Sequence, residues 1–444
     1  MSFPFRVVEH VVPGQYIREY PRATSTSQEQ TLRLAVKQYI PLDNPSPQPG
    51  DVTIIAAHAN GFPKELYEPL WEELHARSKN HGFRIRSIWM ADVAHQGQSG
   101  VINEDVLGND PSWYDHPRDL LHLINLKRDE MPRPIVGIGH SMGGAHLVAL
   151  SLTVPRLFHS LVLLDPVIQR QTTQFPEDFQ GKFVPLNTVL STYRRDIWPS
   201  RKAAAESFSR SPFYKAWNPR VLERWVKYGL RELPTATHPL PSTEAHNKNQ
   251  SDDEKPVTLI TTRHQEVFTF SRPNYDYDTE TNKPASVSET PDLIPNEPNP
   301  HPFYRPEPVQ IFYNLPHLRP SVLYIFAGQS NMCPPHMMAD KLDNTGIGAG
   351  GSGGVAAGRV KSVFFKEKGH LLAQEAVIEC ADAAADFFGP ELKRWKAEDD
   401  AFRQEWNRKS KVEKVTVDER WLKEIGPPPA RPSRSTDGNS KPKL

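Results

Sequence analysis

Apolar runs of strand length recur along the chain and alternate with segments of helical spacing. The strand-like runs fall at residues 34–36, 52–57, 84–90, 135–138, 161–164, 322–326 and 363–365. The helix-like segments fall at residues 66–76, 120–126 and 375–388. This alternation predicts an α/β fold, with a mostly parallel sheet flanked by helices. In such sheets the chemistry lies at the carboxyl ends of the strands.

The strand rhythm stops between residues 168 and 315. Two aromatic-rich helical segments, at 193–217 and 221–230, are followed by polar, proline-rich stretches at 234–256 and 271–308. We interpret residues 168–315, called the insertion below, as a lid; its aromatic residues can equally form a small satellite core, and the two interpretations are compatible. The predicted division is a core of residues 1–167, the insertion, a second core part of 316–390, a charged helical extension of 391–425 and a disordered tail of 426–444.

Composition excludes several classes of protein. The 444 residues carry 53 basic and 53 acidic side chains, so nothing favours a nucleic-acid partner. The only cysteines are Cys333 and Cys380, too few for a disulfide framework, and they fit a reducing compartment. The N-terminal residues lack a signal-peptide core, and no apolar run reaches the ~18 residues of a membrane span. We therefore expect a soluble protein that is not secreted by the usual route.

One strand-like run leads into Gly139-His140-Ser141-Met142-Gly143, and an apolar helical segment follows. A strand, a G-x-S-x-G turn and a helix are typical of a nucleophile elbow, in which the serine lies at the tip of a sharp turn. Such a turn tolerates only small neighbours, and the two glycines meet that demand. Ser141 is therefore the candidate nucleophile. The alternative is a serine in an ordinary glycine-rich turn.

A serine hydroxyl needs a base within hydrogen-bond reach to act as a nucleophile at neutral pH. In the α/β-hydrolase fold this base is a histidine after the last strand, far downstream of the serine. His370 lies in a Gly-His loop between the last strand-like run and the closing helix, so it is the candidate base. His140 and His146 flank the elbow and are interpreted as structural, and His58 and His95 as loop-bracing residues.

The third member of a triad is less clear from the residues. Its usual place, after the strand-like run at 322–326, holds Asn331, which cannot supply a negative charge. Asp165 ends the strand-like run at 161–164, and Asp340 and Asp343 lie further along. Neighbouring strands are ~5 Å apart, so a carboxylate from either strand end can reach the same imidazole. The three aspartates remain candidates at this point.

Two backbone N–H groups are needed to stabilise the oxyanion of an acyl transfer. One is expected from Met142, the residue after the nucleophile. The other is expected from the loop of residues 58–63, where Gly61-Phe62-Pro63 favours Phe62, with Asn60 as the alternative. The serine at the elbow excludes haloalkane dehalogenases and epoxide hydrolases, which use a carboxylate nucleophile. The glycine-rich run at 346–358 lacks the Lys-Ser or Lys-Thr of a phosphate loop, and we expect no cofactor and no metal.

Five longer stretches add specificity: HANGFPKELYEPLWEEL from residue 58, ADVAHQGQSG from 91, VGIGHSMGG from 136, LVLLDPVI from 161 and EKGHLLAQEA from 367. With them the chain resembles a fungal α/β-hydrolase family typified by the mycophenolic acid acyl-CoA hydrolase, with host-toxin biosynthesis hydrolases as relatives. The resemblance covers residues 10–390. It implies a triad of Ser141, His370 and Asp165, the last because the family's acid follows the strand after the elbow helix.

The resemblance also implies a peroxisomal homodimer that acts on acyl-CoA thioesters of secondary metabolites. The C-terminal Pro442-Lys443-Leu444 suits recognition by a peroxisomal import receptor, although Pro442 replaces the usual small residue; a cytoplasmic protein that ends in Lys-Leu by chance is the alternative. The sequence therefore predicts a serine hydrolase of acyl-CoA thioesters. A lipase or carboxylester hydrolase is the alternative, and a non-catalytic binding protein of the same fold is a third hypothesis.

Overall fold

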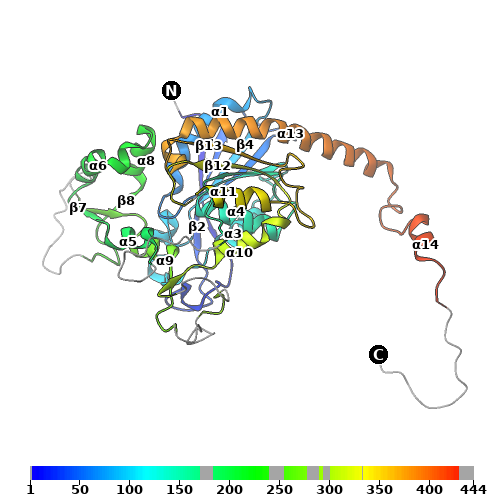
Figure 1. Cartoon of the computed structure of the whole chain (residues 1–444). Helices are drawn as coiled ribbons and strands as arrows, with labels where there is room; N and C mark the ends of the chain where they lie inside the picture. Colours follow the sequence, from blue (N-terminus) through cyan, green and yellow to red (C-terminus); the bar gives the residue numbers. More distant parts are fainter. Residues whose placement is uncertain are drawn as a thin grey trace, which may run out of the picture. The chain divides into compact units, whose positions relative to one another are not determined.

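A computed structural model describes residues 3–170, 184–239, 255–277, 290–293, 301–332 and 334–429. Its centre is a β-sheet with helices around it (Figure 1). This sheet has eight strands in the order β1-β2-β4-β3-β5-β6-β12-β13. The strands are β1 (Phe5–Pro13), β2 (Arg33–Pro41), β3 (Val52–Ala57), β4 (Ile85–Ala91), β5 (Ile135–His140), β6 (Ser160–Leu164), β12 (Ser321–Ala327) and β13 (Val360–Phe365). Only the pairs β1–β2 and β2–β4 are antiparallel, so the expected mostly parallel sheet is confirmed.

The central strands β3, β5, β6 and β12 are buried on both faces of the sheet, which explains why they are continuous apolar runs. Side chains alternate between the faces along each strand. Ile54 and Val136 belong to one apolar core, whereas their neighbours Ile55 and Ile135 belong to the other. The two cores hold the helices against opposite faces of the sheet.

One face packs against α1 (Glu68–Ser78) and the first part of α13 (Val377–Arg408), through residues such as Trp71 and Phe388. The other face packs against α3 (Asp115–Leu126), α4 (Met142–Thr153) and α10 (Glu307–Asn314). Shorter helical elements lie in the connections. They are η1 (Pro21–Ala23), η2 (Lys64–Tyr67), α2 (Gly97–Ile102), η3 (Glu104–Val106), η5 (Leu315–His317), α11 (Pro335–Asn344) and α12 (Leu372–Glu375).

The insertion contains its own short elements between β6 and α10. They are α5 (Leu186–Tyr193), β7 (Ile197–Trp198), α6 (Arg201–Arg210), α7 (Pro212–Lys215), α8 (Pro219–Tyr228), β8 (Leu230–Glu232), β9 (Val257–Leu259), α9 (Arg263–Phe270), β10 (Arg272–Pro273) and β11 (Phe303–Tyr304). The expected helical segment at 193–217 is thus broken by β7. Trp217 and Trp225 are buried in the core, whereas Tyr193 and Phe213 line a cavity. The aromatic residues are therefore divided between the cavity wall and the core on one face of the sheet, and the buried ones do not form a separate satellite core.

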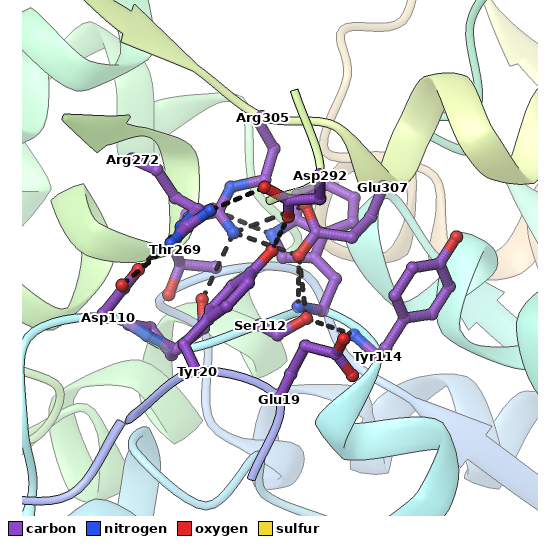
Figure 2. A network of polar contacts seen from close by, with 12 residues as sticks. Glu19, Tyr20, Asp110, Ser112, Tyr114, Thr269, Arg272, Asp292, Arg305 and Glu307 are labelled. Atoms are coloured by element: carbon purple, nitrogen blue, oxygen red, sulfur yellow. Dashed lines mark hydrogen bonds and ion pairs between the residues drawn. The ribbon is translucent and has the colours of Figure 1, made fainter. Parts of the chain in front are cut away.

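A buried network of charges attaches the insertion to the core (Figure 2). Arg272 donates to both carboxylate oxygens of Asp110, at 2.7 and 2.9 Å. Glu307, at the start of α10, accepts from Arg305 at 3.1 Å and from the backbone N–H of Trp113 at 2.8 Å. Removing one partner of a buried pair costs about 3–5 kcal/mol because it leaves an unpaired charge, so this network holds the insertion in one position.

The chain divides into two units, residues 1–393 and 394–444. The second unit contains the end of α13 and the short helix α14 (Glu419–Ile425), and the side chains of Trp421 and Ile425 in it are exposed. The last residues of the predicted tail, 430–444, lie outside the described residues, as does Cys333. Among the helices that are described, none combines the length and the apolarity needed to span a membrane.

Candidate active site

Ser141 lies between β5 and α4, in the sharp turn that its sequence predicts. Its backbone has φ 55° and ψ −118°, a conformation that costs energy for a residue with a side chain. A Cβ atom on Gly139 would lie 2.6 Å from the backbone oxygen of Gly143, and one on Gly143 would lie 2.2 Å from that of Ala57. The two glycines are therefore required by close backbone packing, which holds the strained turn in place.

His370 lies in the loop between β13 and α12 and reaches across to the elbow. Its Nε2 atom is 2.8 Å from Oγ of Ser141, and its Nδ1 atom is 2.6 Å from Oδ2 of Asp165. A neutral imidazole in this position donates its Nδ1 proton to the carboxylate and accepts the serine proton at Nε2. This is the arrangement that activates a serine for attack on a carbonyl carbon.

Asp165 directly follows β6, and its carboxylate is fully buried. Burial raises the pKa of this carboxyl, but the hydrogen bond and the charge of His370 outweigh burial, so its pKa lies below the usual value. Its other oxygen accepts the backbone N–H of Ala327, the last residue of β12, at 3.3 Å. Asp340, one of the alternatives, is instead paired with Arg170 at 2.7 Å. Of these two carboxylates, only Asp165 contacts the imidazole.

Ser330 was not singled out by the sequence, yet it lies beside this carboxylate. Its Oγ is 3.5 Å from Nδ1 of His370, and its hydrogen bond helps to lower the pKa of Asp165. It lies in the loop after β12, next to Asn331, at the usual place of the acid of a triad. The signal in the sequence that could have identified Ser330 is therefore its position after β12 and not its residue type.

The backbone donors near Ser141 can be sorted by their partners. Met142 is the first residue of α4, so its N–H has no acceptor within the helix. In the loop after β3, the N–H of Ala59 donates to Tyr67 Oη at 2.8 Å and that of Gly61 to Gln96 Oε1 at 2.8 Å.

The N–H of Phe62, the donor favoured from the sequence, bonds to the carbonyl oxygen of Ala59 at 3.3 Å within its own turn. The N–H of Asn60 has no hydrogen bond to any described residue. The side chain of Asn60 is held from both ends, because Gln96 donates to its oxygen at 2.7 Å and its nitrogen donates to the carbonyl of Glu266 at 3.0 Å. The alternative donor, Asn60, is thus the one that is both available and fixed.

Ser141 and His370 open into a cavity of about 710 Å³. Its wall combines the core, the insertion and the loop after β12. The apolar part includes Phe62, Trp113, Val167, Val189, Leu190, Phe213, Phe270 and Val309. Deep apolar cavities with a few fixed polar groups are typical of small-molecule sites.

The four basic residues near the start of α6, Arg194, Arg195, Arg201 and Lys202, have different surroundings. Arg194 lines the cavity and is paired with the buried Glu266 at 2.7 Å. Arg201 donates to the carbonyl oxygens of Val226 and Lys227 near the end of α8, so it has a structural partner. Arg195 lies over the ring of Trp198 and Lys202 is exposed. Of the four, Arg194 alone is placed in the wall of the cavity.

The described residues contain no group of three or more histidine, cysteine or acidic side chains that is arranged to hold a metal ion. The hydroxyl of Ser141 and the carboxylate of Asp165 are both within hydrogen-bond distance of the imidazole of His370.

The model of the alpha/beta hydrolase family matches residues 54–387, which include the elbow, Asp165 and His370. The chain belongs to the alpha/beta hydrolase family. The predictions of an α/β-hydrolase fold and of a hydrolase are thus confirmed. A solved structure, the peroxisomal alpha-beta-hydrolase Lpx1 from Saccharomyces cerevisiae, has the same fold with a TM-score of 0.61 at 18% identity, over 93% of this chain and 99% of that one.

Within the alpha/beta hydrolase family, the chain is similar to curated fungal proteins over its whole length. The type I acyl-CoA thioesterase mpaH of Penicillium roqueforti is 41% identical over 100% of both chains, and mpaH' of Penicillium brevicompactum is 39% identical over 98% of both. The abhydrolase domain-containing protein AFT2-1 of Alternaria alternata is 28% identical over 58% of this chain and 84% of that protein. The family resemblance drawn from the sequence motifs is thus confirmed.

Proposed function

We propose that the protein hydrolyses acyl-CoA thioesters through an acyl-enzyme intermediate on Ser141. The observation that carries this proposal is the line of contacts Ser141–His370–Asp165 at the wall of an apolar cavity. Full-length relatives at 39–41% identity are named acyl-CoA thioesterases, which supports a thioester as the bond that is cleaved.

In the first half-reaction, Oγ of Ser141 attacks the thioester carbonyl carbon while Nε2 of His370 takes the hydroxyl proton. Asp165 keeps the imidazole oriented and stabilises the imidazolium that forms. The N–H groups of Met142 and Asn60 donate to the oxyanion of the tetrahedral intermediate. The carbon–sulfur bond then breaks, and coenzyme A leaves as a thiol with the proton from His370.

In the second half-reaction, water replaces the thiol. His370 removes a proton from the water as the oxygen attacks the acyl-enzyme carbonyl carbon, and the same two N–H groups hold the oxyanion. The bond to Oγ breaks, the imidazolium returns its proton to Ser141, and the carboxylic acid is released. No cofactor enters the balance, because water supplies both the oxygen and the protons.

The acyl group is proposed to be apolar and of substantial size, such as a fatty or aromatic secondary-metabolite chain. Aromatic and aliphatic side chains make up most of the cavity wall, and a cavity of about 710 Å³ is far larger than an acetyl group needs. Two cationic side chains of the insertion, Arg194 and Arg305, lie in the wall, where they can meet a polar part of the substrate although each is paired with a buried glutamate.

The test is a panel of acyl-CoA thioesters of increasing acyl size, with release of free thiol as the readout. We expect turnover with apolar acyl groups, labelling of the wild type by a fluorophosphonate, and loss of both in Ser141→Ala. Brisk cleavage of p-nitrophenyl esters without thiol release from any acyl-CoA would assign a carboxylester hydrolase instead. Unchanged turnover in Ser141→Ala would remove the elbow from the reaction.

We further propose a peroxisomal location and a homodimer. Lys443-Leu444 at the C-terminus supports import by a receptor, and these residues lie outside the described part of the chain. Removing the last two residues should move a fluorescent fusion from peroxisomes to the cytoplasm. Sedimentation of the purified full-length chain measures the oligomeric state.

A further inference from the structure

Two buried side chains outside the cavity connect the loop of residues 58–63, which contains the proposed oxyanion donor Asn60, with the loop of His370. Tyr67 belongs to η2 and His140 is the last residue of β5. Tyr67 Oη lies 2.8 Å from the backbone nitrogen of Ala59 and 2.9 Å from Nδ1 of His140. Nε2 of His140 lies 3.0 Å from the backbone oxygen of His370. Neither side chain lines the cavity.

In this series of hydrogen bonds, the groups at the two ends determine which atom donates and which accepts in every bond. The carbonyl oxygen of His370 can only accept, so Nε2 of His140 carries the proton. In a neutral imidazole Nδ1 then accepts, so the hydroxyl of Tyr67 donates to it. That hydroxyl in turn accepts the N–H of Ala59. The four groups therefore form one consistent series of donors and acceptors.

His140 is held in the neutral form that this series requires. Burial, together with the neighbouring His370, lowers the pKa of His140 to about 3. A protonated ring would place a second proton at Nδ1, opposite the hydroxyl proton of Tyr67. Because both side chains are almost completely buried, water cannot replace either bond without a change in packing.

We propose that Tyr67 and His140 are positioning residues that fix the distance between the oxyanion donors and the catalytic base. Ala59 precedes Asn60, whose N–H is a proposed oxyanion donor, and His140 precedes the nucleophile Ser141. One series of hydrogen bonds thus fixes the relative positions of the oxyanion donor, the nucleophile and the base, which come from three separate segments of the chain. The proposal rests on the proposed function, since it assigns no chemistry of its own to either residue.

Misplacement of reacting groups by about 1 Å can cost on the order of 100-fold in rate. Tyr67→Phe leaves the Ala59 N–H and the His140 ring without their shared partner. His140→Leu removes both bonds of the ring, whereas the amide of His140→Gln can still donate to the carbonyl of His370. We expect kcat to fall about 10- to 100-fold in Tyr67→Phe and His140→Leu, with KM within about twofold of the wild type.

Two matched controls separate this role from a general need for buried polar groups. Tyr39→Phe removes another fully buried tyrosine hydroxyl, which contacts Glu68 at 3.3 Å. His146→Leu removes another buried histidine of the elbow segment, and neither of its ring nitrogens has a hydrogen bond to a described residue. All variants are compared by kcat, KM, fluorophosphonate labelling rate and melting temperature.

The proposal requires three results: a fall in kcat beyond that of the controls, recovery of most of kcat in His140→Gln, and a smaller loss when Tyr67→Phe is added to His140→Leu than when it is made in the wild type, because only the bond to Ala59 is then left to lose. If Tyr67→Phe and His140→Leu match their controls in kcat, or change KM alone, the proposal is wrong. Should His140→Leu not fold, Tyr67→Phe against Tyr39→Phe still decides. Activity that survives in Ser141→Ala would instead refute the proposed function, so the two failures are distinguishable.

Discussion

Nδ1 of His370 lies 2.6 Å from Oδ2 of Asp165, although these residues follow strands that are not neighbours in the sheet. Asp165 follows β6, His370 follows β13, and β12 lies between them. Two strand spacings amount to about 10 Å, so the loop after β13 must bend back over the end of β12. The strand in the middle contributes a backbone N–H to the carboxylate through Ala327.

This relationship predicts that Asp165 cannot be replaced by its amide. Asp165→Asn keeps the shape of the side chain but offers no charge to the imidazolium and favours the wrong tautomer. We expect kcat to fall on the order of 10⁴-fold in steady-state thiol release. Asp340→Asn is the control, because Asp340 is paired with Arg170, and it should stay within about twofold. The reverse ranking would show that the acid is misassigned.

Gln96 holds the loop of the proposed oxyanion donor from two sides. Its Oε1 accepts the N–H of Gly61 and its Nε2 donates to the side chain of Asn60. Gln96→Met keeps the volume and removes both bonds, together with the bond from Nε2 to Oγ1 of Thr269 at 3.0 Å. We expect kcat to fall about 10- to 100-fold, which is no more than the loss of a whole oxyanion donor costs. Gln38→Met, at a buried glutamine of β2, is the control. Equal kinetics in the two variants would contradict the role of Gln96.

Leu190 is 59% exposed although it lines the cavity, so its apolar surface is available to a substrate. Leu190→Ser removes a contact whose burial by an acyl chain is worth about 1.5 kcal/mol. We expect KM for the preferred acyl-CoA to rise about 10-fold with kcat nearly unchanged. Leu126→Ser, at an exposed leucine at the end of α3, is the control. A change in kcat without a change in KM would place Leu190 outside the binding surface.

Stability should fall as the pH drops below about 6.5. Among the described histidines, burial lowers the pKa of six: His58, His95, His116, His140, His146 and His264. Below pH 6.5 the unfolded chain binds protons that the folded chain excludes. Each such histidine therefore lowers the free energy of unfolding by about 1.4 kcal/mol per pH unit. Burial raises the pKa of Asp115 to about 7. The folded chain therefore binds one proton there that the unfolded chain does not, which offsets the contribution of one histidine.

The measurement is the melting temperature between pH 7.5 and 5. We expect it to fall with pH in the wild type and to fall less steeply in His116→Met, because neither ring nitrogen of His116 has a hydrogen bond to a described residue. A melting temperature that is flat over this range, or an unchanged slope in His116→Met, would contradict the assignment of these groups.

Much of the fold and two residues of the candidate site follow from local pattern. The apolar runs coincide with β3, β5, β6 and β12 because strands buried on both faces have few polar positions. Ser141 follows from the small residues that its strained turn demands. His370 follows from its place between the last strand and the closing helix.

The partners of these residues were decided only by the tertiary structure. The residues alone left Asp165, Asp340 and Asp343 open, and the resemblance favoured Asp165; the order β6-β12-β13 is what brings its carboxylate to the imidazole. The N–H of Phe62 bonds to the carbonyl oxygen of Ala59, and Tyr67 and Gln96 accept the N–H groups of Ala59 and Gly61, so the N–H of Asn60 is the one left available in this loop. Hydrogen bonds between groups far apart in the chain depend on strand order and loop direction, and no local pattern of apolar and polar positions encodes either.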